Sequence, residues 1–599
     1  MIRCLVHWVE PHAIRTLTVS AAVVVVLSAV TLAQAADPAK RWHGVLQEDV
    51  PGFDPAGPTN TSAAAVVELV FERLLTYDYL ARPAKLVPMA AEAMPVVSDE
   101  GKTWTVKIRK GIFFAPDAAF KGARRELTAR DVVYTFMRFM DPAQRSPYQF
   151  MMRNKLAGLD ALARTPKNGK FDYDAHIPGV EAVDRYTVRF RLVEADYRFG
   201  YLLAHTAAGL VAREVVETYG ADVGRHPVGT GPYALTSWTQ GTRAVLDANP
   251  EYRGFVWDFV PGSDPRDKEI VAQMRGKRMP QIGHIELSII EEDTTYWLTF
   301  LRGDLDVVNL LPRFHAQALV GGKLAPDLAA KGLAIYSATT PAAGFTAFNF
   351  RDPIVGGFTP EKTALRRAIA LGYKGDDLVH VVLHDNAERA QMPIPPGVTG
   401  HDPGYRSNNA YDPELANRLL DRFGYKRGAD GFRTLPDGKP LELVRNSYTG
   451  GTARDEDLIW QKSMERIGLR IRMETLTGAE TAKLSTTCTM MMFSWNWFAD
   501  YPDGENFMQL LYGANSFESN PGCYRSDAYD RLYRQAESLP DGAERNRLFV
   551  AMARQMEADT AWVLGAYPRR IVVMQPWVLG HKAHPFLYSI LPYVDLKPH

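Results

Sequence analysis

A carboxylate set among aromatic side chains is the feature of this sequence best suited to bind a charged group. Asp500 stands beside Trp497, Phe498 and Tyr501, immediately before the turn sequence Pro-Asp-Gly. An aspartate at such a turn commonly accepts hydrogen bonds from nearby backbone N–H groups. A carboxylate in an aromatic-walled cleft can instead hold the cationic group of a ligand. The residues alone leave both roles open.

Metal chemistry has one candidate, the pair His380 and His384. If residues 376–389 form a helix, the four-residue spacing places both imidazoles on one face, where they could bind a metal ion. No glutamate stands between them, and His581 and His584 add no further ligand spacing. We therefore interpret the pair as a polar helix face and expect no metal and no other cofactor.

Motifs for covalent or phosphoryl chemistry are missing from the sequence. It has no Gly-x-Ser-x-Gly, His-Glu-x-x-His or Cys-x-x-Cys pattern. Gly229 and Gly231 lie in a glycine-rich stretch, but the Lys-Ser/Thr of a phosphate loop does not follow them. We predict a tight turn that leads into a strand there, and the missing motifs argue against an enzyme without deciding the question.

A buried strand is expected to position Asp500. Met490 to Trp497 is a nearly continuous apolar run, and Pro502 and Gly504 prevent its simple extension. Periodicity elsewhere predicts strands at 103–108, 186–192, 345–350 and 469–473, and helices at 62–75, 132–140, 365–371, 415–423 and 458–467. This is the pattern of a mixed α/β protein.

Local signals mark the ends of several elements. Thr128 is predicted to cap the helix at 132–140, with Asp131 in its first turn. Gly303 ends a helical pattern, and Gly468 turns a helix into a strand. From residue 561 onward the chain is apolar and punctuated by proline, so we expect it to pack on the body of the protein.

Length and charge limit the fold and the partners. A chain of 599 residues is too long for one core, which predicts two to four domains. Lys plus Arg and Asp plus Glu both number 69, so no net field favours nucleic acid. A neutral or zwitterionic small ligand suits this balance better.

The first 36 residues have the composition of a signal peptide. Arg3 and Arg15 precede an apolar stretch at 17–32, which ends at the sequence Ala-Gln-Ala. The apolar run is at most about 16 residues, below the roughly 20 needed to span a membrane. Cys4 lies before this run and so offers no site for a lipid anchor. We expect cleavage near Ala36, a periplasmic location and no stable membrane insertion.

Two cysteines, Cys488 and Cys523, remain after that cleavage and bracket the Asp500 stretch. In an oxidising compartment they can pair, closing a loop of about 35 residues with a stabilisation of about 3–4 kcal/mol. Cys488 can equally be a buried thiol on a strand. The sequence does not decide between these alternatives.

Six stretches together give the chain a family resemblance. It resembles the family 5 solute-binding proteins of bacterial ABC importers, which include oligopeptide, dipeptide and nickel binders. The matching stretches are Pro88–Glu92, Gly101–Gly111, Leu127–Tyr134, Pro227–Tyr233, Leu301–Asp306 and Trp497–Tyr501. They follow the family's order over essentially the whole mature chain.

The resemblance implies an α/β, bilobal periplasmic-binding-protein fold, with two mixed-sheet lobes, hinge crossovers and an extra subdomain on the first lobe. The boundaries that we predict are 1–36 for the signal peptide, 37–85, 213–336 and 568–599 for lobe I, 86–212 for its subdomain, and 337–567 for lobe II. Ligand would be enclosed between the lobes, because fixed partners must replace the water lost by its polar ends.

The resemblance also implies a role for Asp500, since the matching aspartate of peptide-binding members pairs with the ligand's α-ammonium. Trp497, Phe498 and Tyr501 would form nearby wall or packing. Peptide binders carry basic side chains on the preceding strand for the ligand's carboxylate, and this sequence has none between Lys483 and Asp500. The carboxylate partner must come from elsewhere, or the ligand lacks a free carboxylate.

We therefore expect a monomeric periplasmic receptor that delivers a small peptide to an ABC permease and its ATPase subunits. A different solute, such as an opine, a sugar or a metal chelate, is the alternative within the family. An enzyme that uses the same cleft is the alternative from another class.

Overall fold

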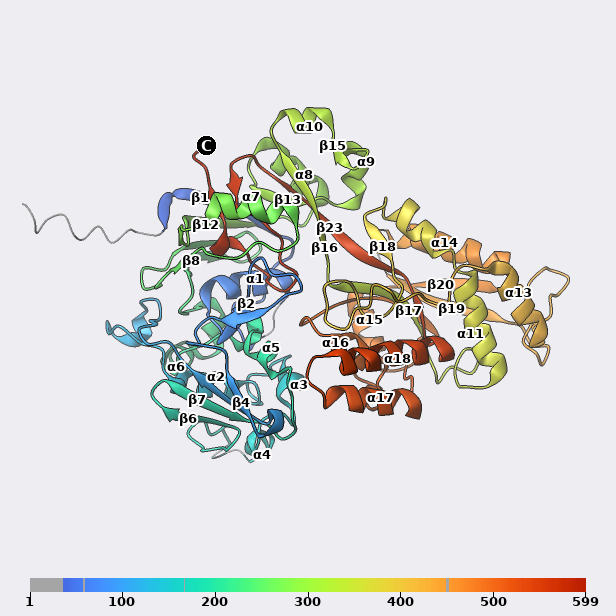
Figure 1. Ribbon diagram of the computed structural model, residues 1–599, viewed down its shortest axis with the longest axis horizontal. Coiled ribbons are helices and arrows are strands. Elements are labelled where there is room, and N and C mark those ends of the chain that lie inside the picture. Colours follow the sequence, from blue (N-terminus) through green and yellow to red (C-terminus); the bar gives the residue numbers. More distant parts are fainter. Residues whose placement is uncertain (1–35, 58–59, 166, 168, 449–451) are drawn as a thin grey trace, which may run out of the picture.

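The computed structural model of the protein describes residues 36–57, 60–165, 167, 169–448 and 452–599. Two bodies lie side by side and are joined by long strands near the middle of the view (Figure 1). The predicted signal peptide falls outside the described residues except for Ala36. Across the described ranges, no helix combines the length and apolarity that crossing a membrane requires.

The first lobe is built on a four-stranded mixed sheet. Its order is β1 (Asp37–Leu46), β12 (Ile282–Ile289), β9 (Arg243–Ala248) and β8 (Tyr233–Thr239). β1 and β12 are parallel, and the other neighbours are antiparallel. Trp42, Leu246 and Ile285 are buried in the core of this lobe. Strands from the chain start and from residues 233–289 thus share one core.

Helix α1 (Thr61–Val70) packs in this core but is shorter than predicted. The helical spacing continues to Leu75, yet the chain leaves the helix after Val70 and pairs β2 (Leu75–Tyr77) with β3 (Leu86–Pro88). The carbonyl of Val70 accepts a hydrogen bond from Gly231 N at 2.8 Å, in place of the next helical N–H. A Cβ at Gly229 would lie 2.0 Å from that carbonyl, so the predicted tight turn requires glycine there.

The subdomain is a second four-stranded sheet with its own core. The order is β4 (Val96–Ser98), β5 (Thr103–Lys107), β7 (Thr187–Arg191) and β6 (Val180–Asp184), and all neighbours are antiparallel. Helix α2 (Ala129–Arg138) covers it, with Thr128 as the predicted cap and Asp131 in the first turn, and the two side chains form a capping box. The short helix α5 (Phe199–Leu203) ends this segment next to the second body (Figure 1).

The second lobe has a five-stranded sheet in which the Asp500 strand is central. The order is β20 (Arg470–Leu476), β19 (Glu442–Tyr448), β21 (Met492–Phe498), β17 (Ala342–Phe348) and β22 (Trp562–Leu564). The helices of this lobe are α11 (Pro360–Gly372), α13 (Pro413–Arg422), α14 (Ala453–Arg466), α17 (Asp527–Glu537) and α18 (Ala543–Asp559). Gly468, at φ 75°, carries the chain from α14 into β20 as predicted.

Two antiparallel strands connect the lobes, β16 (Ala334–Thr339) and β23 (Ala566–Met574). β16 runs directly into β17, and β23 directly follows β22, so each strand passes from one lobe to the other. β13 (Val307–Asn309) pairs with the end of β23 and β18 (Ala387–Arg389) with its start. The expected hinge crossovers are therefore present, while the residue boundaries of the domains stay a prediction.

The C-terminal tail returns to the first lobe, as its apolar composition predicted. β24 (Val578–Leu579) pairs with β25 (Asp595–Leu596), and the indole N–H of Trp257 donates to Tyr593 O at 3.0 Å. Val594 and Leu596 are buried in the first-lobe core. The tail therefore packs on the first lobe, as predicted.

The prediction that His380 and His384 share a helix face is wrong. A π-helical turn spans Leu378–Val382 and ends before His384, which has a left-handed φ of 49°. His380 Nδ1 instead lies 2.5 Å from Asp385 Oδ1. In the part of the chain that the structure describes, no group of three or more His, Cys, Asp or Glu side chains is arranged to hold a metal ion.

Cys488 and Cys523 form a disulfide, the first of the two alternatives for this pair. Their Cα atoms are 5.9 Å apart and their sequence separation is 35. The side-chain amide of Asn349 donates to Cys488 O at 2.7 Å, which ties the bond to the end of β17. The cystine thus closes a segment that contains Asp500.

We expect replacement of both cysteines by serine to lower the free energy of unfolding by about 3–4 kcal/mol, because the unfolded chain loses a loop constraint of this length. Urea unfolding followed by circular dichroism measures the difference. Reductant should lower the unfolding midpoint of the wild type and leave the double variant unchanged. Equal midpoints for the oxidised wild type and the double variant would contradict this account.

Candidate ligand-binding cleft

Three cavities adjoin one another, and two of them lie between the lobes. The outer cavity, about 700 Å³, is lined by Asp500 and Trp497 of the second lobe and by Tyr201 of the subdomain. The middle cavity, about 410 Å³, shares Asp500 with it. The inner cavity, about 570 Å³, shares Arg570 and Tyr588 with the middle one, and its lining comes from the first lobe and β23. The outer and middle cavities thus form a cleft between the lobes, which the inner cavity extends into the first lobe.

The end of β21 distributes the four predicted site residues over this cleft. Side chains alternate across a strand, so Trp497 lines the outer cavity and Phe498 the middle one. Tyr501 faces the outer cavity, and Asp500, two residues beyond the strand, lines both. The structure therefore brings all four to the cleft, with the carboxylate at the junction of two cavities.

A buried amide that sequence reasoning missed holds this arrangement. Asn506, in the short helix α16 (Glu505–Met508), accepts from the indole N–H of Trp497 at 2.9 Å and from Asp500 N at 3.1 Å. Its own NH₂ donates to Asp500 Oδ2 at 2.9 Å. Asn506 is 2% exposed. An asparagine six residues after the aspartate was the available signal, but only the fold brings the two together.

The Asp500 carboxylate has no counter-charge within the described residues. Its side chain is exposed to the cavities, and protein from both lobes and the subdomain surrounds it. Burial raises the pKa of this carboxyl above its usual value, although the hydrogen bond from Asn506 acts in the opposite direction. Oδ1 is left without a protein partner among the residues described. A cationic ligand group would offset the free-energy cost of holding the ionised carboxylate in this surrounding.

An ion-pair network closes the outer cavity between the subdomain and the second lobe. Arg198, at the start of α5, places Nη1 2.9 Å from Glu505 Oε2 and Nη2 3.2 Å from Glu537 Oε1. Its Nε donates to Asp196 at 3.0 Å. Tyr501 donates to Glu505 at 2.7 Å. These contacts join the wall of the cleft to the Asp500 loop.

Carboxylates outnumber cations in this network, since Arg198 faces Asp196, Glu505 and Glu537 and only Lys155 adds a second positive charge. Burial acts to raise the pKa of Glu505, but the nearby Arg198 guanidinium holds it below the usual value. The rings of Tyr201 and Tyr501 stack across the same boundary, 5.9 Å apart and nearly parallel. The network therefore joins the subdomain to the second lobe, and each of its carboxylates has a cationic partner within the protein.

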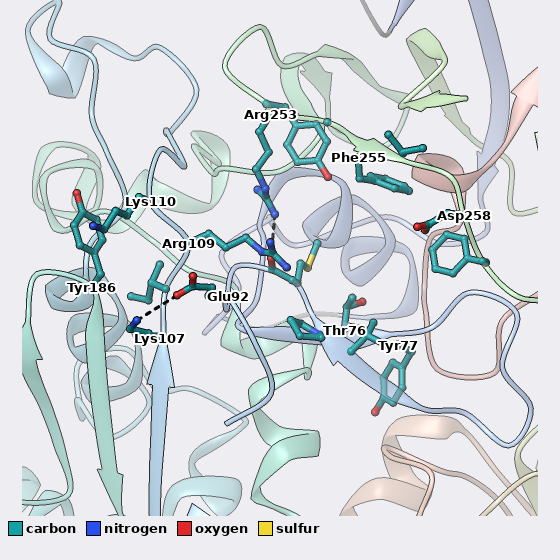
Figure 2. A pocket seen from close by; sticks show the side chains of 18 of the residues that line it. Thr76, Tyr77, Glu92, Lys107, Arg109, Lys110, Tyr186, Arg253, Phe255 and Asp258 are labelled. Atoms are coloured by element: carbon teal, nitrogen blue, oxygen red, sulfur yellow. Dashed lines mark hydrogen bonds and ion pairs between the residues drawn. The ribbon is translucent and has the colours of Figure 1, made fainter. Parts of the chain in front are cut away.

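A larger cavity of about 1070 Å³ shares Tyr77 with the middle cavity (Figure 2). It is lined by the first lobe, the subdomain and Tyr593, with no second-lobe residue among its lining. Lys107 pairs with Glu92 at 3.7 Å, and Arg253 pairs with Glu72 at 2.6 Å. Movement of one lobe against the other would not enclose this cavity. We therefore place the candidate site at Asp500 despite the smaller volume.

Comparison with known proteins gives a consistent picture. A sequence model of the bacterial extracellular solute-binding proteins, family 5 Middle, matches residues 85–519. Di/tripeptide-binding protein 2 of Pseudomonas aeruginosa is 26% identical over 554 residues, which cover 89% of this chain and 91% of that protein. Heme-binding protein A of Haemophilus influenzae is 23% identical over 548 residues, covering 90% and 89%.

Solved structures share the fold. The ABC transporter-associated periplasmic binding protein DppA from Helicobacter pylori, in complex with peptide STSA, matches with a TM-score of 0.69 and 20% identity. The match covers 93% of this chain and 97% of that one, which confirms the predicted bilobal fold. Because the family model spans most of the chain, this protein belongs to the bacterial extracellular solute-binding proteins of family 5.

Proposed function

We propose that the protein is a periplasmic receptor that captures a peptide between its two lobes and delivers it to an ABC importer. The observation that carries this proposal is the Asp500 carboxylate, which faces the cleft without a counter-charge among the described residues. The peptide-binding names of similar proteins support the same ligand class.

An α-ammonium group matches the chemistry of this carboxylate. Asn506 orients the side chain through Oδ2, which leaves Oδ1 to accept a hydrogen bond from one of the three N–H donors of the ligand's ammonium. Trp497 and Tyr501 on one side, and Phe498 on the other, form apolar walls for the first residue of the peptide. The positive charge would also offset the cost of desolvating Asp500.

Delivery requires partners beyond the ligand. We propose that the loaded receptor, as a monomer, docks on a membrane permease that is driven by ATPase subunits. Family membership and the predicted signal peptide support an exported receptor of this kind. The role is capture and release, so the chain supplies binding groups and no catalytic ones.

Native mass spectrometry of the purified protein tests the ligand class. A cleft that encloses its solute between two lobes should carry it through purification, so we expect retained masses that fragment as peptides. Added peptide should also raise the melting temperature, with a stabilisation of about 2.7 kcal/mol at a concentration one hundred times the Kd. Retention of a non-peptide mass would favour another solute, and turnover of an added peptide would favour an enzyme.

We expect Asp500→Asn to weaken binding of free-amine peptides by roughly 30-fold to several-thousand-fold, because the ligand's ammonium loses its counter-charge inside the cleft. Calorimetry with a peptide and its N-acetylated form measures this effect. Acetylation should weaken binding to the wild type strongly and to the variant little.

Asp455→Asn is the matched control, since it removes an exposed carboxylate from the same lobe at a distance from the three cavities. It should bind both peptides as the wild type does. If acetylation weakens the wild type and Asp500→Asn by the same factor, Asp500 is a turn residue and does not bind the ammonium.

The raised pKa of Asp500 predicts a second effect, on the ligand-free protein. Because the folded-state pKa exceeds the unfolded value, the ionised carboxyl destabilises the folded state, and this penalty is relieved as the pH falls through the raised pKa. At neutral pH its ionised form destabilises the fold. We expect Asp500→Asn to melt above the wild type at about pH 7, with a smaller difference near pH 4. Calorimetric melting curves test this, and a lower melting temperature at pH 7 would contradict it.

A further inference from the structure

Arg570 lies in the middle of β23, in the strand pair that joins the lobes. Its backbone pairs with Ala338 of β16, and its side chain lines both the middle and the inner cavity. Over the described ranges, its guanidinium has no hydrogen bond and no carboxylate at ion-pair distance. Arg570 is exposed to these cavities, so water solvates its charge in the ligand-free cleft, and covering it with a ligand is costly unless the ligand supplies a partner.

The other cations that line the cleft are all paired. In the outer cavity, Lys155 Nζ lies 2.6 Å from Asp196, and Arg198 is bound by three carboxylates. Arg153 lies 3.9 Å from Glu518. Among the described cationic Lys and Arg side chains of the three cavities, Arg570 is therefore the one left without a carboxylate.

The histidines and the tyrosine near Arg570 are neutral at physiological pH. Burial lowers the pKa of His581 to about 3 and that of His584 well below its usual value. Burial raises the pKa of Tyr336 to about 12. Arg266 adds a second positive charge nearby: it stacks on Tyr336, with its guanidinium 3.6 Å from the ring centroid, and donates to His581 O. Glu48 also lines the inner cavity but forms no ion pair with Arg570 in the described part of the chain.

The middle cavity carries opposite charges on its lining. Asp500 and Arg570 both line it, and they do not form an ion pair with each other. Apolar surface from Phe498, Phe586 and Leu587 lines the same cavity. A ligand with separated positive and negative groups and an apolar part would satisfy all of these features.

We propose that Arg570 binds the carboxylate of the ligand whose ammonium group binds Asp500. The ligand class is then a zwitterion, a short peptide with both termini free, and this inference rests on the proposed function. A guanidinium suits the role because its planar N–H fork can bind both carboxylate oxygens. It also supplies the carboxylate partner that the sequence before Asp500 lacks.

The position of Arg570 on β23 makes the subsite well defined. β16 pairs along the strand, while β13 and β18 pair with its two ends. A side chain on such a paired strand is held more firmly than one on a loop. The subsite would therefore select the carboxylate at a fixed distance from Asp500 and so limit the ligand's length.

Binding of a randomised library of di- to tetrapeptides with free termini, compared with the same library amidated at the C terminus, tests this proposal. Calorimetry on wild type and Arg570→Gln should show that amidation weakens wild-type binding by roughly 30-fold or more. The variant should bind both libraries equally weakly. Arg570→Lys should recover part of the discrimination, because it restores the charge without the fork.

Arg569→Gln is the matched control. It removes the neighbouring guanidinium of the same strand, which lines none of the three cavities and pairs with Glu388 on the surface. This variant should discriminate as the wild type does. If Arg570→Gln fails to fold, Arg570→Lys decides: discrimination as strong as in the wild type would contradict the assignment.

The outcomes separate this proposal from the proposed function. If the wild type distinguishes acetylated from free-amine peptides but binds amidated and free-acid libraries equally, Arg570 is not the carboxylate partner and the peptide receptor stands. Discrimination that survives in Arg570→Gln also overturns the assignment. If neither library binds the wild type at all, both proposals fail.

Discussion

An ionised side chain inside a protein costs free energy unless an opposite charge or hydrogen-bond donors replace the water that it loses. Most charges around the cleft meet this requirement within the protein, as the contacts of Arg198 with Glu505 and of Lys155 with Asp196 show. The Arg198–Glu505 pair joins the subdomain to the second lobe. Asp500 and Arg570 line the middle cavity without a counter-charge among the described residues. We propose that a ligand supplies the missing charges.

The geometry of the hinge strands brings these two side chains to one cavity. β16 becomes β17 through Thr340 and Pro341, and the carbonyl of Pro341 accepts from Ala499 N at 2.8 Å. Asp500 is the next residue, so it lies beside the point where the chain enters the second lobe. Arg570 lies beside β16 on the other hinge strand. The two charges therefore belong to the region about which the lobes turn.

Local patterns in the sequence were sufficient for much of the fold. The apolar run before Asp500 predicted a strand, and Thr128 and Gly468 marked a helix start and a helix end that the structure contains. The end of α1 was predicted too late, because a tertiary hydrogen bond from Gly231 to Val70 replaces the helical one. The paired histidines were misplaced, because a π-helical turn ends before His384.

The site was predictable only in part, for a related reason. Asp500 and its aromatic neighbours are consecutive, so a motif reveals them. Asn506 reaches Asp500 from the far side of a turn. Arg570 lies on a strand seventy residues further along. Neither is recognisable until long-range strand pairing places it. Residue types were enough to identify Asp500, whereas Arg570 could be identified only from the strand pairing.

The cystine between Cys488 and Cys523 makes completion of the cleft an oxidative step. The segment that it closes carries Asp500, Asn506 and the wall residues near Phe517, so its two ends are fixed only after both thiols have been oxidised. Reducing compartments keep such thiols separate. The same bond therefore links the positions of Asp500 and Asn506 to the redox state of the surroundings.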